Sequence, residues 1–196
     1  MSKIGLYFGS YNPIHSGHVA IANFMLEQTD MEEVWFMVSP QNPLKKEEGL
    51  LDEDIRLQMV EIVTKQNPGL KASNFEFDLP KPSYTRTTLD KLKQTYPEYD
   101  FQMILGEDNI RYFHLWKDYE SILDEYAIWV YPRAGVRSDE LNEELLTHHN
   151  VHYQINAPLF NLSSTQIRRA IQKGDNVENL IPTEVFTFIT ENQLYR

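Results

Sequence analysis

The chain has 196 residues, of which 41% are hydrophobic, so it is long enough to bury a sizeable core and we expect one domain spanning residues 1–196. Its 18 Lys and Arg against 29 Asp and Glu give a formal charge of −11, which disfavours general nucleic-acid binding because phosphate neutralisation needs clustered basic side chains. The absence of cysteine excludes disulfides, thiol catalysis and cysteine-ligated zinc.

The first apolar run, IGLYF at residues 4–8, predicts a short strand that is buried on both faces. It is too short for the hydrophobic core of a signal peptide. No later window approaches the roughly eighteen apolar residues that a membrane span needs. We therefore expect a soluble cytoplasmic protein that does not bind membranes.

The polar segment GSYNPIHSGH follows this strand and leads into a predicted helix over residues 17–28. Gly9 and Gly17 would let the backbone approach a ligand closely. The start of the helix would offer free N–H groups and the positive end of its dipole to a phosphate. We expect His15 on the loop and His18 in the first helical turn, where both imidazoles can donate to polyphosphate oxygens.

Other interpretations of the two histidines have less support. A zinc site usually needs three or four protein ligands, and no acidic or further histidine cluster lies beside His15 and His18. A nucleophile elbow needs a G-x-S-x-G motif after a strand, which this chain lacks. A plain polar turn with hydrogen-bonded imidazoles is the usual role of an isolated histidine. We predict no metal site built from protein ligands.

Further apolar runs alternate with amphipathic stretches along the rest of the chain. Strands are predicted at 34–38, 101–105 and 127–131, with a weaker one at 151–155. Helices are predicted at 52–66, 85–96, 140–149, 163–174 and 183–195. This alternation favours the α/β class, with a Rossmann-like, open, doubly wound parallel sheet and helices on both faces.

In such a sheet, ligands bind outside the carboxyl ends of the strands, where the strand order reverses. Four segments rich in polar residues, glycine or proline directly follow predicted strands. They are GSYNPIHSGH, SPQNPLKK, GEDNIRYFHLW and YPRAG. Their shared position after strands predicts that they converge on one site.

A second segment near the C terminus is also suited to an anion. In LSSTQIR, Ser163 and Gln166 form a capping box that opens a helix. Ser164 and Thr165 add hydroxyls beside free N–H groups, and Arg168 lies one turn further along. Such helix starts are common, so capping alone would also explain this pattern.

Both segments resemble signatures of the nucleotidyltransferase superfamily, G-x-F-x-P-x-H-x-G-H and I-S-S-T-x-I-R. The resemblance implies that His15, His18 and Arg168 are catalytic residues acting on the phosphates of ATP. It places His18 at the α-phosphate and His15 at the β- and γ-phosphates. Ser164 and Thr165 would join Arg168 in holding the leaving pyrophosphate.

Further segments resemble those of the bacterial nicotinate-nucleotide adenylyltransferases. SPQNPLKK resembles N-P-P-H-K, with Leu44 and Lys45 replacing the second proline and the histidine, so either Lys45 or Lys46 takes the place of the family lysine. SYTRTTL is similar to S-Y-T-x-D-T-L, and we assign Thr88 to the aspartate position. GEDNIRYFHLWKDY and the ending LIPTEVFTFITENQLY also resemble segments of this family. The resemblance spans nearly the whole chain.

The same resemblance implies the rest of the ATP site. Asp108 would accept from ribose hydroxyls or cap the next short helix, and Arg133 would flank the adenine or remain solvated. Besides the three catalytic residues, we expect the following around ATP: Gly9, Ser10, Tyr11, Lys45, Lys46, Gly106, Asp108, Arg133, Ser164 and Thr165.

The acceptor site is expected to recognise a pyridine ring that carries a carboxylate. Trp116 would provide an aromatic plane on which the ring stacks, although a tryptophan that only packs in the core is an equal alternative. Tyr84 and Thr85 would donate to the carboxylate, and Asn42 completes the expected set.

The function implied by the resemblance is adenylyl transfer. The adenylyl group of ATP would pass to nicotinate mononucleotide, forming deamido-NAD (nicotinate adenine dinucleotide) and pyrophosphate in NAD biosynthesis. Because the acceptor phosphate is already ionised, the protein has to provide only positioning and charge stabilisation. We expect Mg²⁺ to be bound mainly through the ATP phosphates.

Several alternatives stay open. The acceptor could instead be nicotinamide mononucleotide, phosphopantetheine or glycerol phosphate, because these share the phosphate machinery. A non-catalytic sensor of ATP or NAD on the same fold is a candidate of another class. The sequence leaves open the choice between acid and amide, the effect of Thr88, and whether the chain forms a homo-oligomer.

Overall fold

The computed structural model of the protein describes residues 1–41, 49–136 and 142–196. Its centre is a six-stranded sheet in the order β3-β2-β1-β4-β5-β6, and every neighbouring pair is parallel. The strands are β1 (Ser2–Gly9), β2 (Glu33–Val38), β3 (Leu70–Ser73), β4 (Tyr99–Gly106), β5 (Ile128–Tyr131) and β6 (Val151–Tyr153). This order confirms the predicted Rossmann-like, doubly wound sheet.

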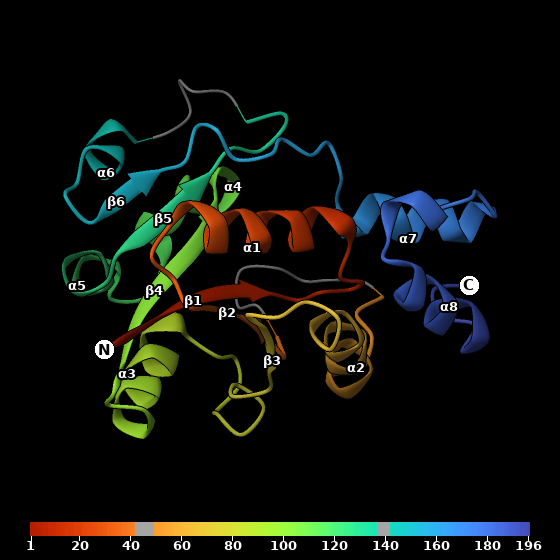
Figure 1. Cartoon of the computed structure of the whole chain (residues 1–196), viewed down its shortest axis with the longest axis horizontal. Coiled ribbons are helices and arrows are strands. Elements are labelled where there is room, and N and C mark those ends of the chain that lie inside the picture. Colours follow the sequence, from red (N-terminus) through yellow and green to blue (C-terminus); the bar gives the residue numbers. More distant parts are fainter. Residues whose placement is uncertain (42–48, 137–141) are drawn as a thin grey trace.

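Helices cover both faces of this sheet (Figure 1). They are α1 (Ser16–Gln28), α2 (Glu53–Thr64), α3 (Thr85–Thr95), α4 (Glu107–Ile110), α5 (Tyr119–Glu125), α6 (Glu143–Leu146), α7 (Ser164–Lys173) and α8 (Thr183–Glu191). Two 3₁₀ turns, η1 (Phe113–Leu115) and η3 (Glu178–Leu180), complete the described elements.

The apolar strands divide their side chains between two hydrophobic cores. In β2, Val34 and Phe36 pack in the core beneath α1, α2 and α8, whereas Trp35 and Met37 pack in the core beneath α3 and α5. This alternation follows from the period of two along a strand. It explains why a strand covered on both faces is apolar throughout.

The expected elements are present with different boundaries, and some were missed. The strand expected at 151–155 spans 151–153, and the helix expected at 140–149 has its described turn at Glu143–Leu146, with residues 140 and 141 outside the described part. Strand β3 was missed because it forms the edge of the sheet, where only Leu70 is fully buried. The short α4 and α5 offer too few residues for a helical pattern.

The order of the strands fixes where a ligand can bind. From β1, the chain continues through β2 to β3 on one side, and then crosses to β4 on the other side of β1. The carboxyl ends of β1 and β4 therefore form the point at which the strand order reverses. The segments that begin at Gly9 and Gly106 both start there.

No helix within the described ranges is long and apolar enough to cross a membrane.

Candidate active site

The first phosphate-suited segment adopts the expected strand–loop–helix arrangement. His15 is the N-cap of α1, with extended backbone angles of φ −140° and ψ 169°, and His18 is the third helical residue. The backbone N–H of His18 donates to the carbonyl of His15 at 2.9 Å, which closes the first turn. The prediction of one imidazole on the loop and one in the first turn is confirmed.

The two imidazoles form a stacked pair, with ring centroids 3.7 Å apart and an interplanar angle of 23°. The backbone N–H of His15 donates to Nδ1 of His18 at 3.2 Å. When His18 is neutral, its proton therefore resides on Nε2. The rings of Tyr7 and Tyr11 meet His18 edge-on, with centroids 6.0 and 5.1 Å away. The protein thus fixes both the orientation and the tautomer of His18.

Both imidazoles are held in their neutral form. Burial, together with the positive charge of Arg133, lowers the pKa of His15 to about 3. Burial also lowers the pKa of His18 well below its ordinary value, and the neighbouring His15 and Arg133 lower it further. Each ring therefore provides a neutral N–H donor at physiological pH. An anionic ligand would meet hydrogen-bond donors at the pair and a full positive charge at Arg133.

The glycines of this segment make room for side chains of the site itself. A Cβ on Gly9 would lie 2.8 Å from the Tyr11 ring, and a Cβ on Gly17 would lie 3.1 Å from the His15 ring. The expected role for these glycines was close approach of the backbone to phosphate. In the structure, both glycines instead leave room for neighbouring rings. A larger residue at Gly9 would displace Tyr11, which packs against His18, and a larger residue at Gly17 would displace His15 itself.

The second segment docks directly onto the first. Ser163 is the N-cap of α7 and accepts from the backbone N–H of Gln166 at 3.3 Å, which confirms the N-cap half of the predicted capping box. The Gln166 side chain accepts from the Ser163 hydroxyl at 3.0 Å, so the return bond expected to the backbone N–H of Ser163 is replaced by this one. Ser164 Oγ donates to the carbonyl of Pro13 at 2.8 Å. Arg168 donates to the carbonyl of Asn12 at 2.8 Å. Although about 150 residues separate them in sequence, the two segments form one structural unit.

Asn12 is the fully buried centre of this unit. Its side-chain amide donates to the carbonyl of Gly49 at 3.0 Å, and its Oδ1 accepts from the Tyr195 hydroxyl at 2.8 Å. One residue thus links the loop after β1, the segment before α2 and the C-terminal segment. The sequence did not predict that Asn12 links these segments, because a short polar residue in a turn is common and its partners are distant in sequence.

Arg56 of α2 also holds loops of the site in place, a role that was not predicted from the sequence. It is 1% exposed, and its guanidinium donates to the carbonyls of Ser10 at 2.7 Å and Ser39 at 2.8 Å. It also donates to the carbonyls of Leu51 and Pro40. Because three of these carbonyls belong to the loops after β1 and β2, Arg56 fixes both loops at the edge of the sheet. Its position on an amphipathic helix resembles that of an ordinary solvated arginine.

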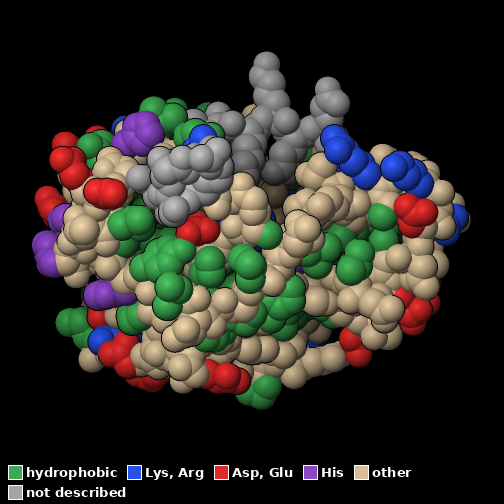
Figure 2. Space-filling model, turned by 90° about the horizontal axis from the view of Figure 1, so that it is seen from above, with side chains coloured by type: hydrophobic (Ala, Val, Ile, Leu, Met, Phe, Trp, Pro, Cys, Tyr) green, Lys and Arg blue, Asp and Glu red, His purple; other side chains and the backbone are tan. Residues whose placement is uncertain are grey.

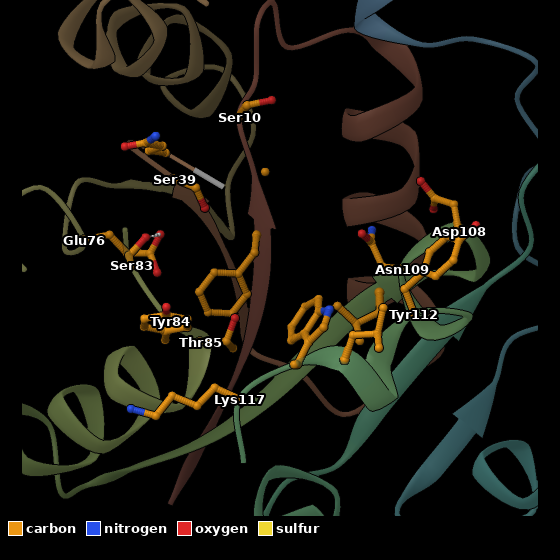
Figure 3. A pocket seen from close by; sticks show the side chains of 16 residues that line it. Ser10, Ser39, Glu76, Ser83, Tyr84, Thr85, Asp108, Asn109, Tyr112 and Lys117 are labelled. Atoms are coloured by element: carbon orange, nitrogen blue, oxygen red, sulfur yellow. Dashed lines mark hydrogen bonds between the residues drawn. The ribbon is translucent and has the colours of Figure 1, made fainter. Parts of the chain in front are cut away.

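A cavity of about 650 Å³ opens beside the carboxyl ends of β1 and β4 (Figure 3). Figure 3 shows Ser39, Glu76, Ser83, Tyr84 and Thr85 on one side, and Asp108, Asn109 and Tyr112 on the other. Its remaining lining residues are Phe8, Gly9, Ser10, Gln41, Leu105, Leu115, Trp116 and Lys117. A cavity of this size, with apolar walls and a few polar groups, is typical of a small-molecule site.

One wall of the cavity is organised by Glu76, which is 2% exposed. Its carboxylate accepts from the hydroxyl of Thr88 at 2.6 Å and from that of Ser83 at 3.3 Å. Burial raises the pKa of Glu76, and hydrogen bonds from Thr88, Ser39 and Ser83 offset part of this rise. Glu76 therefore fixes the start of α3, where Tyr84 is the N-cap.

The assignment of Thr88 to the family's aspartate position is wrong. Matched letter by letter, SYTRTTL places Thr87 opposite that aspartate and Thr88 opposite the threonine that follows it. Thr88 is fully buried and bound to Glu76, so it is part of the wall's framework. The departure from the family motif therefore lies at Thr87, which is partly buried.

The opposite wall is formed by the segment after β4. Asp108 lines the cavity, and its Oδ1 lies 3.6 Å from Nε of Arg133. A Cβ on Gly106 would lie 2.5 Å from this oxygen, so only glycine at position 106 leaves room for the Asp108 carboxylate in this orientation. Glu107 accepts from the backbone N–H of Arg133 at 2.7 Å and from the hydroxyl of Tyr153. Buried Glu107 thereby joins the ends of β4, β5 and β6.

The structure brings most of the predicted residues together. Gly9, Ser10, Asp108, Tyr84, Thr85 and Trp116 line the cavity. The two docked segments carry His15, His18, Ser164, Thr165 and Arg168, and we call them the phosphate unit after the role predicted for them. Tyr11 is 1% exposed, so its ring supports Gly9 and His18 from beneath. Asn42, Lys45 and Lys46 lie outside the described residues.

Helix α7 is basic, in contrast to the acidic chain as a whole. On the face shown in Figure 2, several Lys and Arg side chains lie at the end of the molecule where Figure 1 places α7, with Asp and Glu side chains near them. Helix α7 carries Arg168, Arg169 and Lys173. A local positive field is sufficient to attract a small anion to an otherwise acidic protein.

The described residues fit a metal ion whose ligands come mainly from a bound nucleotide and only in small part from the protein. Among them, no group of three or more His, Asp or Glu side chains is placed to hold a metal ion. Asp108 Oδ1 is buried without a hydrogen-bond partner in the described part of the chain, and Arg133 is its charged neighbour. An ion such as Mg²⁺ would therefore take most of its ligands from phosphate oxygens and water.

Comparison with known proteins relates the chain to one enzyme group. The family model described as cytidylyltransferase-like matches residues 6–170. A probable nicotinate-nucleotide adenylyltransferase of Flavobacterium johnsoniae is 47% identical over 194 residues, covering 99% of each chain. A protein of the same description from Bacteroides thetaiotaomicron is 44% identical and covers 96% of this chain and 91% of its own.

Solved structures show the same fold. Nicotinic acid mononucleotide adenylyltransferase of Plasmodium falciparum, complexed with NaAD, matches with a TM-score of 0.81 at 19% identity, covering 100% of this chain and 98% of that one. The same enzyme complexed with APC gives a TM-score of 0.80. At this identity, the similarity supports the architecture alone.

The depressed pKa of His15 predicts a loss of stability in mild acid. The folded-state pKa is about 3 and the ordinary value is 6.5, so below pH 6.5 the unfolded chain binds a proton that the folded chain excludes. The free energy of unfolding should therefore fall by about 2 kcal/mol between pH 7 and pH 5 through this residue alone.

Urea unfolding of the nucleotide-free protein at the two pH values measures this loss. A His15→Asn variant should lose correspondingly less stability, whereas the exposed control His149→Asn should behave like the wild type. Equal losses in His15→Asn and the wild type would show that His15 titrates normally in the folded protein.

Proposed function

The chain belongs to the cytidylyltransferase-like family, and we infer that it is a nicotinate-nucleotide adenylyltransferase. It transfers the adenylyl group of ATP to nicotinate mononucleotide, forming deamido-NAD and pyrophosphate, a step of NAD biosynthesis. One observation carries this conclusion from the structure. The segments of His18 and Arg168 join into a single phosphate unit, directly beside an aromatic cavity that contains Trp116.

At the phosphate end, we place the triphosphate of ATP over the start of α1. His18 Nε2–H would donate to the α-phosphate, and His15 to the β- and γ-phosphates. The side chains of Ser164 and Arg168 already bond the backbone at Pro13 and Asn12, which fixes them beside these imidazoles. Arg168, with the hydroxyl of Thr165, would hold the leaving pyrophosphate.

At the acceptor end, the cavity suits a pyridine ring that carries a carboxylate. Trp116 in the lining would provide a plane for stacking, and Figure 3 shows Tyr84 and Thr85 on the wall opposite Asp108, Asn109 and Tyr112. Tyr84 and Thr85 also mark the start of the eleven-residue helix α3, whose free N–H groups and dipole favour an anion. Different residues of the lining would therefore contact the ring and its acid group.

The transfer needs no covalent intermediate. An ionised phosphate oxygen of the acceptor forms a bond to the α-phosphorus of ATP, and the bond from that phosphorus to the bridging oxygen breaks. The electron pair of that bond leaves with the pyrophosphate, and no proton has to be removed from the attacking oxygen. The protein aligns the two substrates and stabilises charge on the leaving group through neutral imidazoles and the Arg168 guanidinium.

We propose Mg²⁺ as the cofactor, bound mainly by ATP. Asp108 is the described carboxylate in the cavity that is best placed to contact it or its waters. When bound, the ion neutralises phosphate charge during the transfer.

The aromatic cavity also separates the alternative acceptors. The aromatic side chains of Trp116 and Tyr84 in its lining suit a pyridine ring, whereas phosphopantetheine and glycerol phosphate carry no ring that could stack on them. A non-catalytic sensor would need neither neutral, oriented imidazoles nor an arginine docked beside them. Nicotinamide mononucleotide is the closest competing substrate, because its ring stacks equally well.

The choice of acceptor is tested by pyrophosphate release. With MgATP, the purified protein should release pyrophosphate rapidly when nicotinate mononucleotide is present, more slowly with nicotinamide mononucleotide, and not detectably with phosphopantetheine. Chromatography should show that deamido-NAD forms in an amount equal to that of the pyrophosphate released. Release with none of these acceptors would support the sensor, and release mainly with the amide would overturn the assigned substrate.

Replacing His18 tests the phosphate unit. His18→Ala removes a neutral donor aimed at the α-phosphate, so kcat should fall by roughly 10² to 10³-fold. The melting temperature and the circular dichroism spectrum should stay close to those of the wild type. His149→Ala, on an exposed histidine, is the matched control and should retain full turnover. Near-normal kcat in a folded His18→Ala enzyme would remove His18 from the mechanism.

A further inference from the structure

Lys117 directly follows Trp116 and lines the same cavity, but the reaction described above assigns it no role. Figure 3 shows its side chain running past Thr85 toward Tyr84. The ammonium lies 5.3 Å from the centroid of the Tyr84 ring. A cation over an aromatic face is attracted by the negative face of the ring, which keeps this flexible side chain at the cavity wall.

Lys117 brings a positive charge to a cavity whose other ionisable side chains include two carboxyl groups. Its lining contains the carboxyl groups of Glu76 and Asp108, and Lys117 is the one Lys or Arg in that lining among the described residues. Within the described chain, no carboxylate forms an ion pair with its ammonium, whereas Lys3 and Lys81 each pair with an acidic side chain. The ammonium is therefore available to a ligand.

An acid acceptor and an amide acceptor differ chiefly by one negative charge. Stacking on Trp116 cannot distinguish them, because both have the same ring. The carboxyl groups of Glu76 and Asp108 oppose an anionic ligand wherever they are ionised. The helix dipole of α3 provides only a partial positive charge. A full positive charge beside Tyr84 and Thr85 is what would reverse the balance in favour of the acid.

We propose that Lys117 is a specificity-determining residue, whose ammonium pairs with the ring carboxylate of nicotinate mononucleotide and so favours the acid over the amide. This inference rests on the proposed function and adds the source of its acid preference. Because Lys117 is exposed and flexible, its effect is moderate and depends on salt. It acts on binding of the acceptor and leaves the ATP phosphates and the transfer step unchanged.

The test compares four proteins with both mononucleotides. Lys117→Met keeps the length of the side chain but removes its charge, and Lys117→Arg keeps the charge. Lys91→Met removes a charge from α3 at a position that does not line the cavity. KM and kcat are measured for each acceptor and for MgATP, and titration calorimetry measures binding of each mononucleotide without ATP.

Lys117→Met should raise the KM and Kd for nicotinate mononucleotide by about fivefold to tenfold, with the kcat and the KM for ATP unchanged. The values for nicotinamide mononucleotide should stay within about twofold. Lys117→Arg should restore the acid preference, and Lys91→Met should match the wild type. Raising the KCl concentration from about 50 to about 500 mM should reduce the acid preference of the wild type, which tests the charge without any substitution.

Equal changes for both acceptors in Lys117→Met, or no change for either, would overturn the role of Lys117. A salt-independent acid preference in the wild type would also overturn it. These outcomes leave the proposed function intact, because wild-type turnover is measured in the same series. Failure of the wild type to release pyrophosphate with either mononucleotide would instead refute the proposed function.

Discussion

Two hydrogen bonds to backbone carbonyls, from Ser164 to Pro13 and from Arg168 to Asn12, hold the phosphate end of this protein together. They bring the first two turns of α7 against the loop that carries His15. Because Asn12 also binds the hydroxyl of Tyr195, the C-terminal segment supports the same loop. Without this docking, the imidazoles and the guanidinium would belong to separate surfaces. With it, imidazole and guanidinium donors lie around the place where the triphosphate would bind in the proposed arrangement.

The rest of the site is shaped by buried charges that touch no substrate in the proposed arrangement. Arg56 fixes the loops after β1 and β2 through their carbonyls. Glu76 fixes the start of α3, and Glu107 joins the ends of three strands. Each is nearly or fully buried and is bound to several partners, which offsets the cost of removing it from water. In the proposed mechanism the chemistry is carried by neutral imidazoles and a few cations, whereas the geometry depends on these buried groups.

The fold and the phosphate motifs could be read from the sequence because they depend on local patterns. Apolar runs such as the one at 34–38 predict strands covered on both faces, and the spacing of His15 and His18 predicts a loop followed by a helical turn. The edge strand β3 and the roles of Asn12, Arg56 and Glu76 could not be predicted. Their function depends on partners distant in sequence, and an isolated polar residue on an amphipathic helix or turn resembles a solvated one.

The proposed transfer is a single in-line displacement at the α-phosphorus, with no adenylylated enzyme. It is tested most directly by the stereochemical course of transfer from ATP made chiral at that phosphorus with sulfur and an oxygen isotope. One displacement inverts the configuration, so we expect the dinucleotide to carry the inverted centre. Retention of configuration would require two successive displacements through a covalent adenylyl-enzyme, and would contradict the roles proposed for His15, His18 and Arg168.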